Sequence, residues 1–192
     1  ETLADKVDTA TYPVDESTNT ITVSDAAGAG DHFPTYTGIT LDQDKTYVYE
    51  FTINFSDISA GQIRIPIRKS SGFTDGQWLG MWFPEQQVRL AKDYWSNDGG
   101  VAGTLTYATG TDYKVKVITE PQKATVYVND VKIVEKTYEY KVADGTIGFG
   151  GWGMKQYTLK NVSLVEQGQA AGNLLETLAD KVDTATYPVD ES

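Results

Sequence analysis

Residues 47–55 read YVYEFTINF. Aromatic and aliphatic side chains stand at every second position of this stretch, and other residues stand between them. Because successive side chains of a strand point to opposite faces, this period of two predicts a half-buried β-strand. The alternation returns at 63–68, where three isoleucines alternate with Arg64, Pro66 and Arg68.

Further segments share the period of two or are short apolar runs bounded by turn residues. Asn129 and Asp130 separate two such runs and predict a tight hairpin. Regularly spaced strands with almost no central helix predict an all-β fold, an antiparallel β-sandwich of jelly-roll type. The predicted strands are 20–24, 47–55, 63–68, 77–83, 86–91, 113–119, 124–129, 131–135, 146–150 and 157–165.

Three stretches of the C-terminal half carry a family resemblance. They are YKVKVITEPQKATVYVNDVKIV at 113–134, DGTIGF at 144–149 and YTLKNVSL at 157–164. Together they resemble the C-terminal half of laminin-G-like and concanavalin A-like jelly rolls, a group that includes many bacterial sugar-binding modules. The resemblance covers about residues 18–166 and implies the fold, since strand and hairpin motifs carry it. Glycoside hydrolases of the group have a catalytic strand resembling ExDxxE, which this sequence lacks.

The first 17 residues, ETLADKVDTATYPVDES, recur letter for letter at 176–192. An identical repeat with a shift of 175 residues indicates tandem modules. We therefore expect one repeat module at 1–175, with its sandwich core at about 18–166 and a linker at 167–175. The next tandem repeat would begin at 176–192. A cloning scar or an engineered duplication is the alternative source of the repeat.

Each module is expected to open with a short helix at the junction. Asn173 and Glu176 have the spacing of an N-cap and its reciprocal acidic partner. Apolar residues then follow at helical spacing. They are Leu174, Leu175, Leu178, Ala179 and Val182.

Composition narrows the range of partners. The formal net charge is −11, so a nucleic-acid partner would be repelled. The absence of cysteine excludes disulfides and Cys-based zinc sites. No apolar run approaches the roughly 18 residues of a membrane span. The identical repeat is typical of long surface proteins, so we expect an extracellular protein, attached to the cell surface or secreted. The lack of cysteine does not argue against this location.

The strand predicted at 77–83 is apolar on both faces. If Leu79, Met81 and Phe83 face the core, Trp78 and Trp82 stand outside, with Gly80 leaving a trough between them. Arginines on neighbouring strands would join this face, where rings stack on sugars and guanidinium groups donate to hydroxyls. The alternative is that both tryptophans lie under a loop as ordinary core. The arginines are Arg64, Arg68 and Arg89.

Two other aromatic clusters are candidates for ligand contact. Tyr94 and Trp95 lie in a predicted loop at the rim of the sandwich, where aromatic residues often meet ligands. Trp152 lies among glycines that permit close approach. The alternatives are a hydrophobic plug at the end of the sandwich and a packed indole at a bulge.

Acidic loop residues are weak candidates for a structural calcium ion, which takes six to eight oxygen ligands. The candidates are Asp42, Asp44 and Asp98, although no EF-hand spacing is present and a solvated acidic loop is favoured. His32 is the only histidine, so no multi-histidine metal site can be formed. A Ser-His-Asp triad would also require His32.

The sequence therefore predicts a non-catalytic extracellular repeat module of a bacterial, adhesin-like surface protein. Its expected partners are a glycan, such as a host or cell-surface carbohydrate, and the neighbouring identical repeats. The alternative is a stalk repeat that projects another domain, which the identical duplication favours. A glycan-cleaving enzyme is the third possibility, although no motif identifies two carboxylates at the distance from each other that glycosidases require. No cofactor is expected beyond the candidate calcium.

Overall fold

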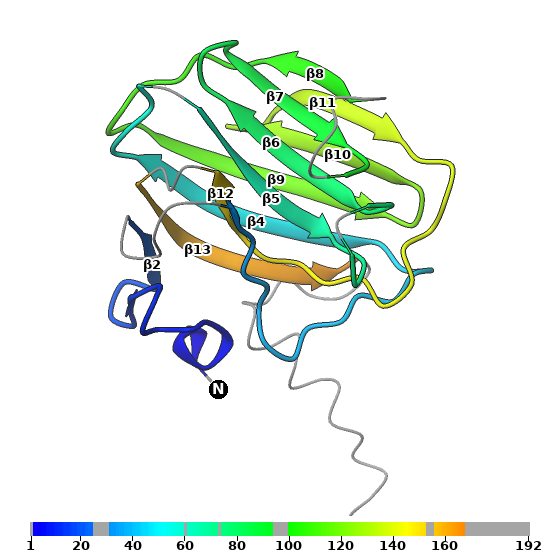
Figure 1. The fold of residues 1–192 in the computed structure, drawn as a ribbon, viewed down its shortest axis with the longest axis horizontal. Coiled ribbons are helices and arrows are strands. Elements are labelled where there is room, and N and C mark those ends of the chain that lie inside the picture. Colours follow the sequence, from blue (N-terminus) through cyan, green and yellow to red (C-terminus); the bar gives the residue numbers. More distant parts are fainter. Residues whose placement is uncertain are drawn as a thin grey trace, which may run out of the picture.

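Two antiparallel sheets stack face to face in the computed structural model (Figure 1). The structure describes residues 2–24, 31–59, 61–72, 74–93, 100–152 and 156–167, without the side chains of residues 31, 32, 151 and 152. The fold class predicted from the sequence is confirmed.

The large sheet has the order β1, β2, β13, β4, β9, β10, β11. Its strands are β1 (Val14–Asp15), β2 (Thr20–Val23), β4 (Tyr47–Phe55), β9 (Asp112–Glu120), β10 (Lys123–Val128), β11 (Val131–Thr137) and β13 (Tyr157–Glu166). The predicted hairpin joins β10 to β11, and both of its turn residues have positive φ, 50° at Asn129 and 65° at Asp130.

The small sheet has the order β5, β6, β7, β8. Its strands are β5 (Gln62–Arg68), β6 (Gln77–Trp82), β7 (Gln87–Ala91) and β8 (Val101–Thr104). The sequence did not predict β8, whose residues VAGT are too small to show an alternation. This strand packs closely on the large sheet, because a Cβ on Gly103 would lie 2.1 Å from the Ile133 carbonyl oxygen of β11.

The core lies between the sheets and follows the predicted alternation. All five alternate residues of β4 from Tyr47 to Phe55 are buried, as are the three isoleucines of β5. On β6, Leu79 and Met81 are fully buried in the same cluster, and Phe83 follows them. Leu79, Met81 and Phe83 therefore face the core, which is the arrangement on which the predicted Trp/Arg face depends.

Residues 145–149 run along the outer edge of β5. Thr146 and Lys69 exchange backbone hydrogen bonds at 2.7 and 2.8 Å, and Gly148 donates to the Pro66 carbonyl at 3.0 Å. The sequence predicted a strand at 146–150, but this stretch forms isolated bridges. The two-residue strand β12 (Gly151–Trp152) follows and pairs with β3 (Asp31–His32).

A pair of buried tyrosines fixes this edge segment to the large sheet. The hydroxyls of Tyr36 and Tyr49 lie 2.8 Å apart, and Tyr49 donates to the Gly148 carbonyl at 3.1 Å. Burial raises the pKa of both phenols, so the hydroxyls stay protonated as donors. A Cβ on Gly148 would lie 2.0 Å from the Pro34 carbonyl oxygen, so only glycine permits this close approach.

Arg68 crosses from the small sheet to the large one. The register of β5 shifts between Pro66 and Arg68, and the Arg68 side chain is fully buried. Its Nε donates to Thr119 Oγ1 at 3.1 Å. Its terminal nitrogens donate to the carbonyls of Asp42, Lys45 and Thr119 at 2.9, 2.9 and 3.2 Å. The expectation that Arg68 stands on the outer face with the tryptophans is therefore wrong, because the bulge turns the side chain inward.

The network around Arg68 continues through two further buried side chains. Thr119 Oγ1 donates to Gln77 Oε1 at 2.7 Å, and Gln77 Nε2 donates to the Glu120 carbonyl at 2.9 Å. Desolvation lowers the pKa of Arg68, while Tyr47 and Asp42 oppose the shift. Polar bonds thus connect β5 and β6 of the small sheet to β9 of the large sheet.

A short 3-10 helix, η1 (Leu3–Lys6), opens the chain and matches the predicted junction helix in kind. The Thr2 backbone N–H donates to Asp5 Oδ2 at 2.6 Å, which completes a capping box at the helix start. The second copy of this sequence, 176–192, and the linker from residue 168 lie outside the described residues. Among the residues described, no helix is long and apolar enough to cross a membrane.

Replacing Arg68 with methionine tests the link between the sheets. The variant would remove the guanidinium donors from the hydroxyl and carbonyl of buried Thr119 and from the carbonyls of Asp42 and Lys45. Each buried group left unsatisfied costs about 1–3 kcal/mol. We expect the free energy of unfolding to fall by about 3 kcal/mol or more in denaturant titration. Lys132→Met on an exposed strand position is the control and should stay within about 0.5 kcal/mol of the wild type. A denaturation midpoint of Arg68→Met equal to that of the wild type would contradict the role of Arg68 in linking the two sheets.

Candidate ligand site on the small sheet

Trp78, Gly80 and Trp82 share the outer face of β6, because the residues between them face the core. The pairing register places Gly80 directly between Arg64 of β5 and Arg89 of β7. A hollow of about 130 Å³ lies over this face. Its lining residues are Arg64, Trp78, Gly80, Trp82, Gln87, Arg89, Ala91, Gly100 and Ala102.

The indole of Trp82 lies among the guanidinium groups. Arg89 Cζ is 3.5 Å from the ring centroid and Arg64 Cζ is 5.1 Å from it, both within the range of a cation–π interaction. Arg89 Nε also donates to Gln87 Oε1 at 2.8 Å, which orients its planar group. Trp82 is half-buried, so part of the ring remains accessible.

The trough predicted over Gly80 is partly filled. A Cβ on Gly80 would lie 2.8 Å from Trp82 Nε1, so the indole of Trp82 leans over the glycine. The hollow that remains is lined by Gly80 and by both indoles. The glycine makes room for the indole, which an alanine would push away.

Trp78 is on the predicted face, but it is covered. Its side chain is 1% exposed, and the Phe33 ring meets it edge-on with 5.3 Å between centroids. For Trp78 the alternative interpretation, an indole beneath a loop, is the correct one. It lines the hollow as a wall, while Trp82 offers the more accessible ring.

The structure brings together four of the predicted residues, Trp78, Trp82, Arg64 and Arg89. Arg68 is separated from them by its bonds to the large sheet. Tyr94, Trp95 and Asp98 lie outside the described residues. Trp152 belongs to β12, and its side chain is not described.

Several lining residues were missed by the sequence reasoning. Gln87 shares the face of Arg89 because the two are two positions apart on one strand, a signal that was available. Gly100 and Ala102 were missed because the strand that follows Gly100 was not predicted. Gly100 has no side chain and that of Ala102 is a single methyl group, so both leave the space that the hollow occupies.

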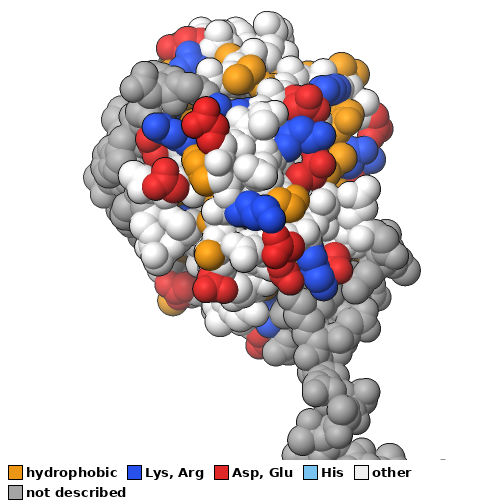
Figure 2. Space-filling model, turned by 90° about the vertical axis from the view of Figure 1, so that its right-hand side faces the viewer, with side chains coloured by type: hydrophobic (Ala, Val, Ile, Leu, Met, Phe, Trp, Pro, Cys, Tyr) orange, Lys and Arg blue, Asp and Glu red, His pale blue; other side chains and the backbone are white. Residues whose placement is uncertain are grey.

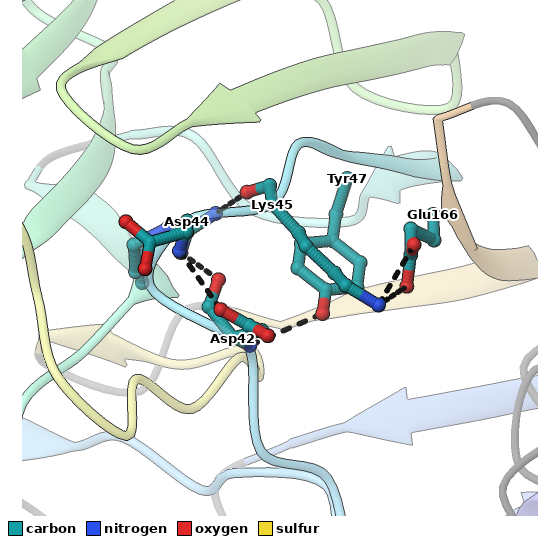
Figure 3. A network of polar contacts seen from close by, with 6 residues as sticks. Asp42, Asp44, Lys45, Tyr47 and Glu166 are labelled. Atoms are coloured by element: carbon teal, nitrogen blue, oxygen red, sulfur yellow. Dashed lines mark hydrogen bonds and ion pairs between the residues drawn. The ribbon is translucent and has the colours of Figure 1, made fainter.

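The two described calcium candidates use their oxygens locally. Asp42 Oδ1 accepts the Asp44 N–H at 2.9 Å, and Asp44 pairs with Lys141. Figure 3 shows the turn that contains Asp42 and Asp44. The hydroxyl of the neighbouring Tyr47 accepts the Asp42 N–H at 3.1 Å, and Lys45 forms an ion pair with Glu166 close by. Within the described ranges, no three His, Cys, Asp or Glu side chains gather as a metal site would require.

Charges of both signs are interspersed on one end of the sandwich (Figure 2). Ion pairs of Lys45 with Glu166 and of Lys123 with Glu120 are examples of the local pairing in the molecule, at 3.0 and 2.8 Å. The hollow on the small sheet differs, since its described lining holds two arginines and no acidic side chain.

Comparison with solved structures identifies the architecture. The chain is similar to the carbohydrate-binding module CBM66 from Bacillus subtilis, with a TM-score of 0.59 and 14% identity over 80% of this chain and 90% of that one. It is also similar to a sialidase, with a TM-score of 0.58 and 12% identity over 82% of this chain, but the match spans only 16% of the sialidase. Similarity to alginate lyase Aly36B has a TM-score of 0.51 and 12% identity over 86% of both chains.

At these identities the likeness shows the fold, a jelly-roll-like β-sandwich. The predicted architecture is thereby confirmed at that level. The sequence matches no protein-family model and no curated protein.

Alanine substitution of the two tryptophans should separate their roles in stability. Trp78→Ala removes a fully buried indole and should cost about 3–5 kcal/mol of unfolding free energy. Trp82→Ala removes a half-buried ring and its guanidinium contacts, and should cost about 1–2 kcal/mol. Thermal and denaturant unfolding measure both. A larger loss for Trp82→Ala than for Trp78→Ala would contradict the burial described above.

Proposed function

We propose that the chain is a non-catalytic carbohydrate-binding module whose site is the hollow on the outer face of the small sheet. The main observation behind this proposal is that Arg64, Arg89 and Trp82 converge around Gly80. Such a site combines the ring and the planar donor groups that sugar recognition uses. The fold shared with a structure described as a carbohydrate-binding module supports the proposal.

The size of the hollow favours a single sugar unit. Its volume of about 130 Å³ is below the roughly 300–1,000 Å³ of pockets for drug-sized ligands. A terminal ring, or one substituent of it, fits such a volume better than an extended chain does. The half-buried Gln87 and Arg89 and the buried Arg64, which is 5% exposed, line the hollow with hydrogen-bonding groups, and Trp82 supplies the apolar surface.

The charge of the hollow favours acidic sugars. The protein carries a net charge of −11, yet the described lining contributes two guanidinium groups. A planar carboxylate can accept two parallel hydrogen bonds from a guanidinium group. A terminal uronic acid is therefore the favoured ligand, with hydroxyl-rich neutral sugars as weaker ones.

We regard the module as non-catalytic because its described lining offers no carboxylate, thiol or imidazole. Acid–base and nucleophilic catalysis both need such a group close to the reacting atoms. We also propose that binding needs no metal, because Asp42 accepts the Asp44 N–H and Asp44 pairs with Lys141.

The identical repeat supports an extracellular, adhesin-like context with neighbouring modules in the same chain. The same repeat also favours the second candidate function, a stalk that spaces another domain. The two differ in whether an isolated module binds a glycan.

Calorimetric titration with glucuronic acid and glucose, backed by a glycan array, tests the proposal. We expect binding of the acidic sugar, at least tenfold weaker in Arg64→Ala and in Arg89→Ala, because a charge-assisted bond contributes about 1.5–3 kcal/mol. Lys132→Ala on the exposed face of β11 is the charge-matched control and should bind normally. EDTA should change nothing. Failure of the wild type to bind any glycan would favour the stalk.

A further inference from the structure

The N-terminal segment is an integral part of the core. Leu3, Val7 and Tyr12 are buried in the same cluster as the strands of both sheets. Their exposed fractions are 5%, 9% and 5%. The sandwich therefore depends on residues that precede its first long strand.

The surface that receives this segment has three parts, which we call the segment cradle: residues 20–23, Thr37 and Phe149. Strand β1 pairs with β2 along residues 20 and 21. Thr37 donates its N–H to the Lys6 carbonyl at 2.9 Å. The Tyr12 ring meets Phe149 edge-on at 5.0 Å between centroids. Backbone bonds and side-chain packing thus both hold the segment.

The chain carries a second copy of the seated sequence, because residues 1–17 and 176–192 are identical. Every group that the cradle contacts in the first copy therefore exists in the second. The counterparts of Leu3, Lys6, Val7, Tyr12 and Val14 are Leu178, Lys181, Val182, Tyr187 and Val189.

We propose that the segment cradle also accepts residues 176–192 of the same chain, in place of residues 2–17. The body of the module then has two equivalent partners, one preceding it and one following it. Exchange between them would release one end of the module while the core stays complete.

The connection is long enough for this exchange. Gln167 lies beside Thr46, with its N–H bonded to the Thr46 carbonyl at 2.8 Å. Thr46 and Thr37 of the cradle are nine residues apart, so they are separated by at most about 32 Å. The fourteen residues from Gln167 to Lys181 span up to about 46 Å when extended.

The preceding segment remains the favoured occupant. A short turn joins it to β2, whereas the second copy reaches the cradle through a longer connection. The entropic cost of closing a loop grows only slowly with loop length, so the second copy is a competent substitute. The second copy should be the main occupant of the segment cradle when the first copy is disabled.

Four full-length chains test the proposal. The first-copy variant carries Leu3→Asp with Val7→Asp, and the second-copy variant carries Leu178→Asp with Val182→Asp. The double variant carries both pairs, and the wild type carries neither. A carboxylate cannot be buried unpaired at these positions without a large cost. We expect the chain disabled only in the first copy to melt roughly 5 °C or more above the chain disabled in both. The chain disabled only in the second copy should melt like the wild type.

Equal melting temperatures of the first-copy and double variants would overturn the proposal. Light scattering on the first-copy variant should give the molar mass of a monomer. The mass of a dimer would show that the segment comes from a second molecule, which would contradict the assignment to the same chain.

A disulfide trap keeps the test informative if the variants fold poorly. The natural chain has no cysteine, and Asp15 of the first copy pairs with Thr20 of β2. Asp190 is its counterpart in the second copy. Thr20→Cys with Asp190→Cys in the first-copy variant should therefore form an intramolecular disulfide, which the double variant should lack. The positive control is Thr20→Cys with Asp15→Cys in the otherwise natural chain. No disulfide in the first-copy variant, with the control formed, would refute the exchange.

Discussion

The burial of Arg68 is the constraint on which the rest of the structure depends. A guanidinium group without exposed surface needs hydrogen-bond acceptors, and here one hydroxyl and three carbonyl oxygens accept from its nitrogens. Those acceptors belong to β9 and to the turn at 42–45, so the arginine fixes the small sheet against the large one. The same bonds hold the turn that leads into β4, whose five alternate residues from Tyr47 to Phe55 are buried in the core.

The candidate site follows from this arrangement through the register of the small sheet. Once β5 is fixed, its pairing with β6 sets Arg64 opposite Gly80, and the pairing of β6 with β7 sets Arg89 on the other side. The absence of a side chain on Gly80 lets the Trp82 indole lie between the two guanidinium groups. A charged hollow in an acidic protein therefore arises from four strands that the core holds in place.

Much of this fold could be predicted because period-two alternation reports burial directly. The core faces of β4, β5 and β6 follow it, and so does the grouping of Trp82 with Arg64 and Arg89. Arg68 could not be placed, because a bulge reverses the alternation and leaves no mark in the sequence. The extent to which Trp82 fills the trough at Gly80 could not be predicted either, since the direction in which an indole leans depends on its neighbours. Strand β8 was invisible because its small residues show no pattern.

The most direct test of the central claim is an NMR titration of labelled protein with glucuronic acid. The account predicts that shifts concentrate on the backbone amides of Gly80, Arg89 and Ala102 and on the indole N–H of Trp82. Amides on the outer face of the large sheet, such as those of Thr52 and Lys116, should stay in place. Shifts on that large-sheet face with none on the small sheet would contradict the account.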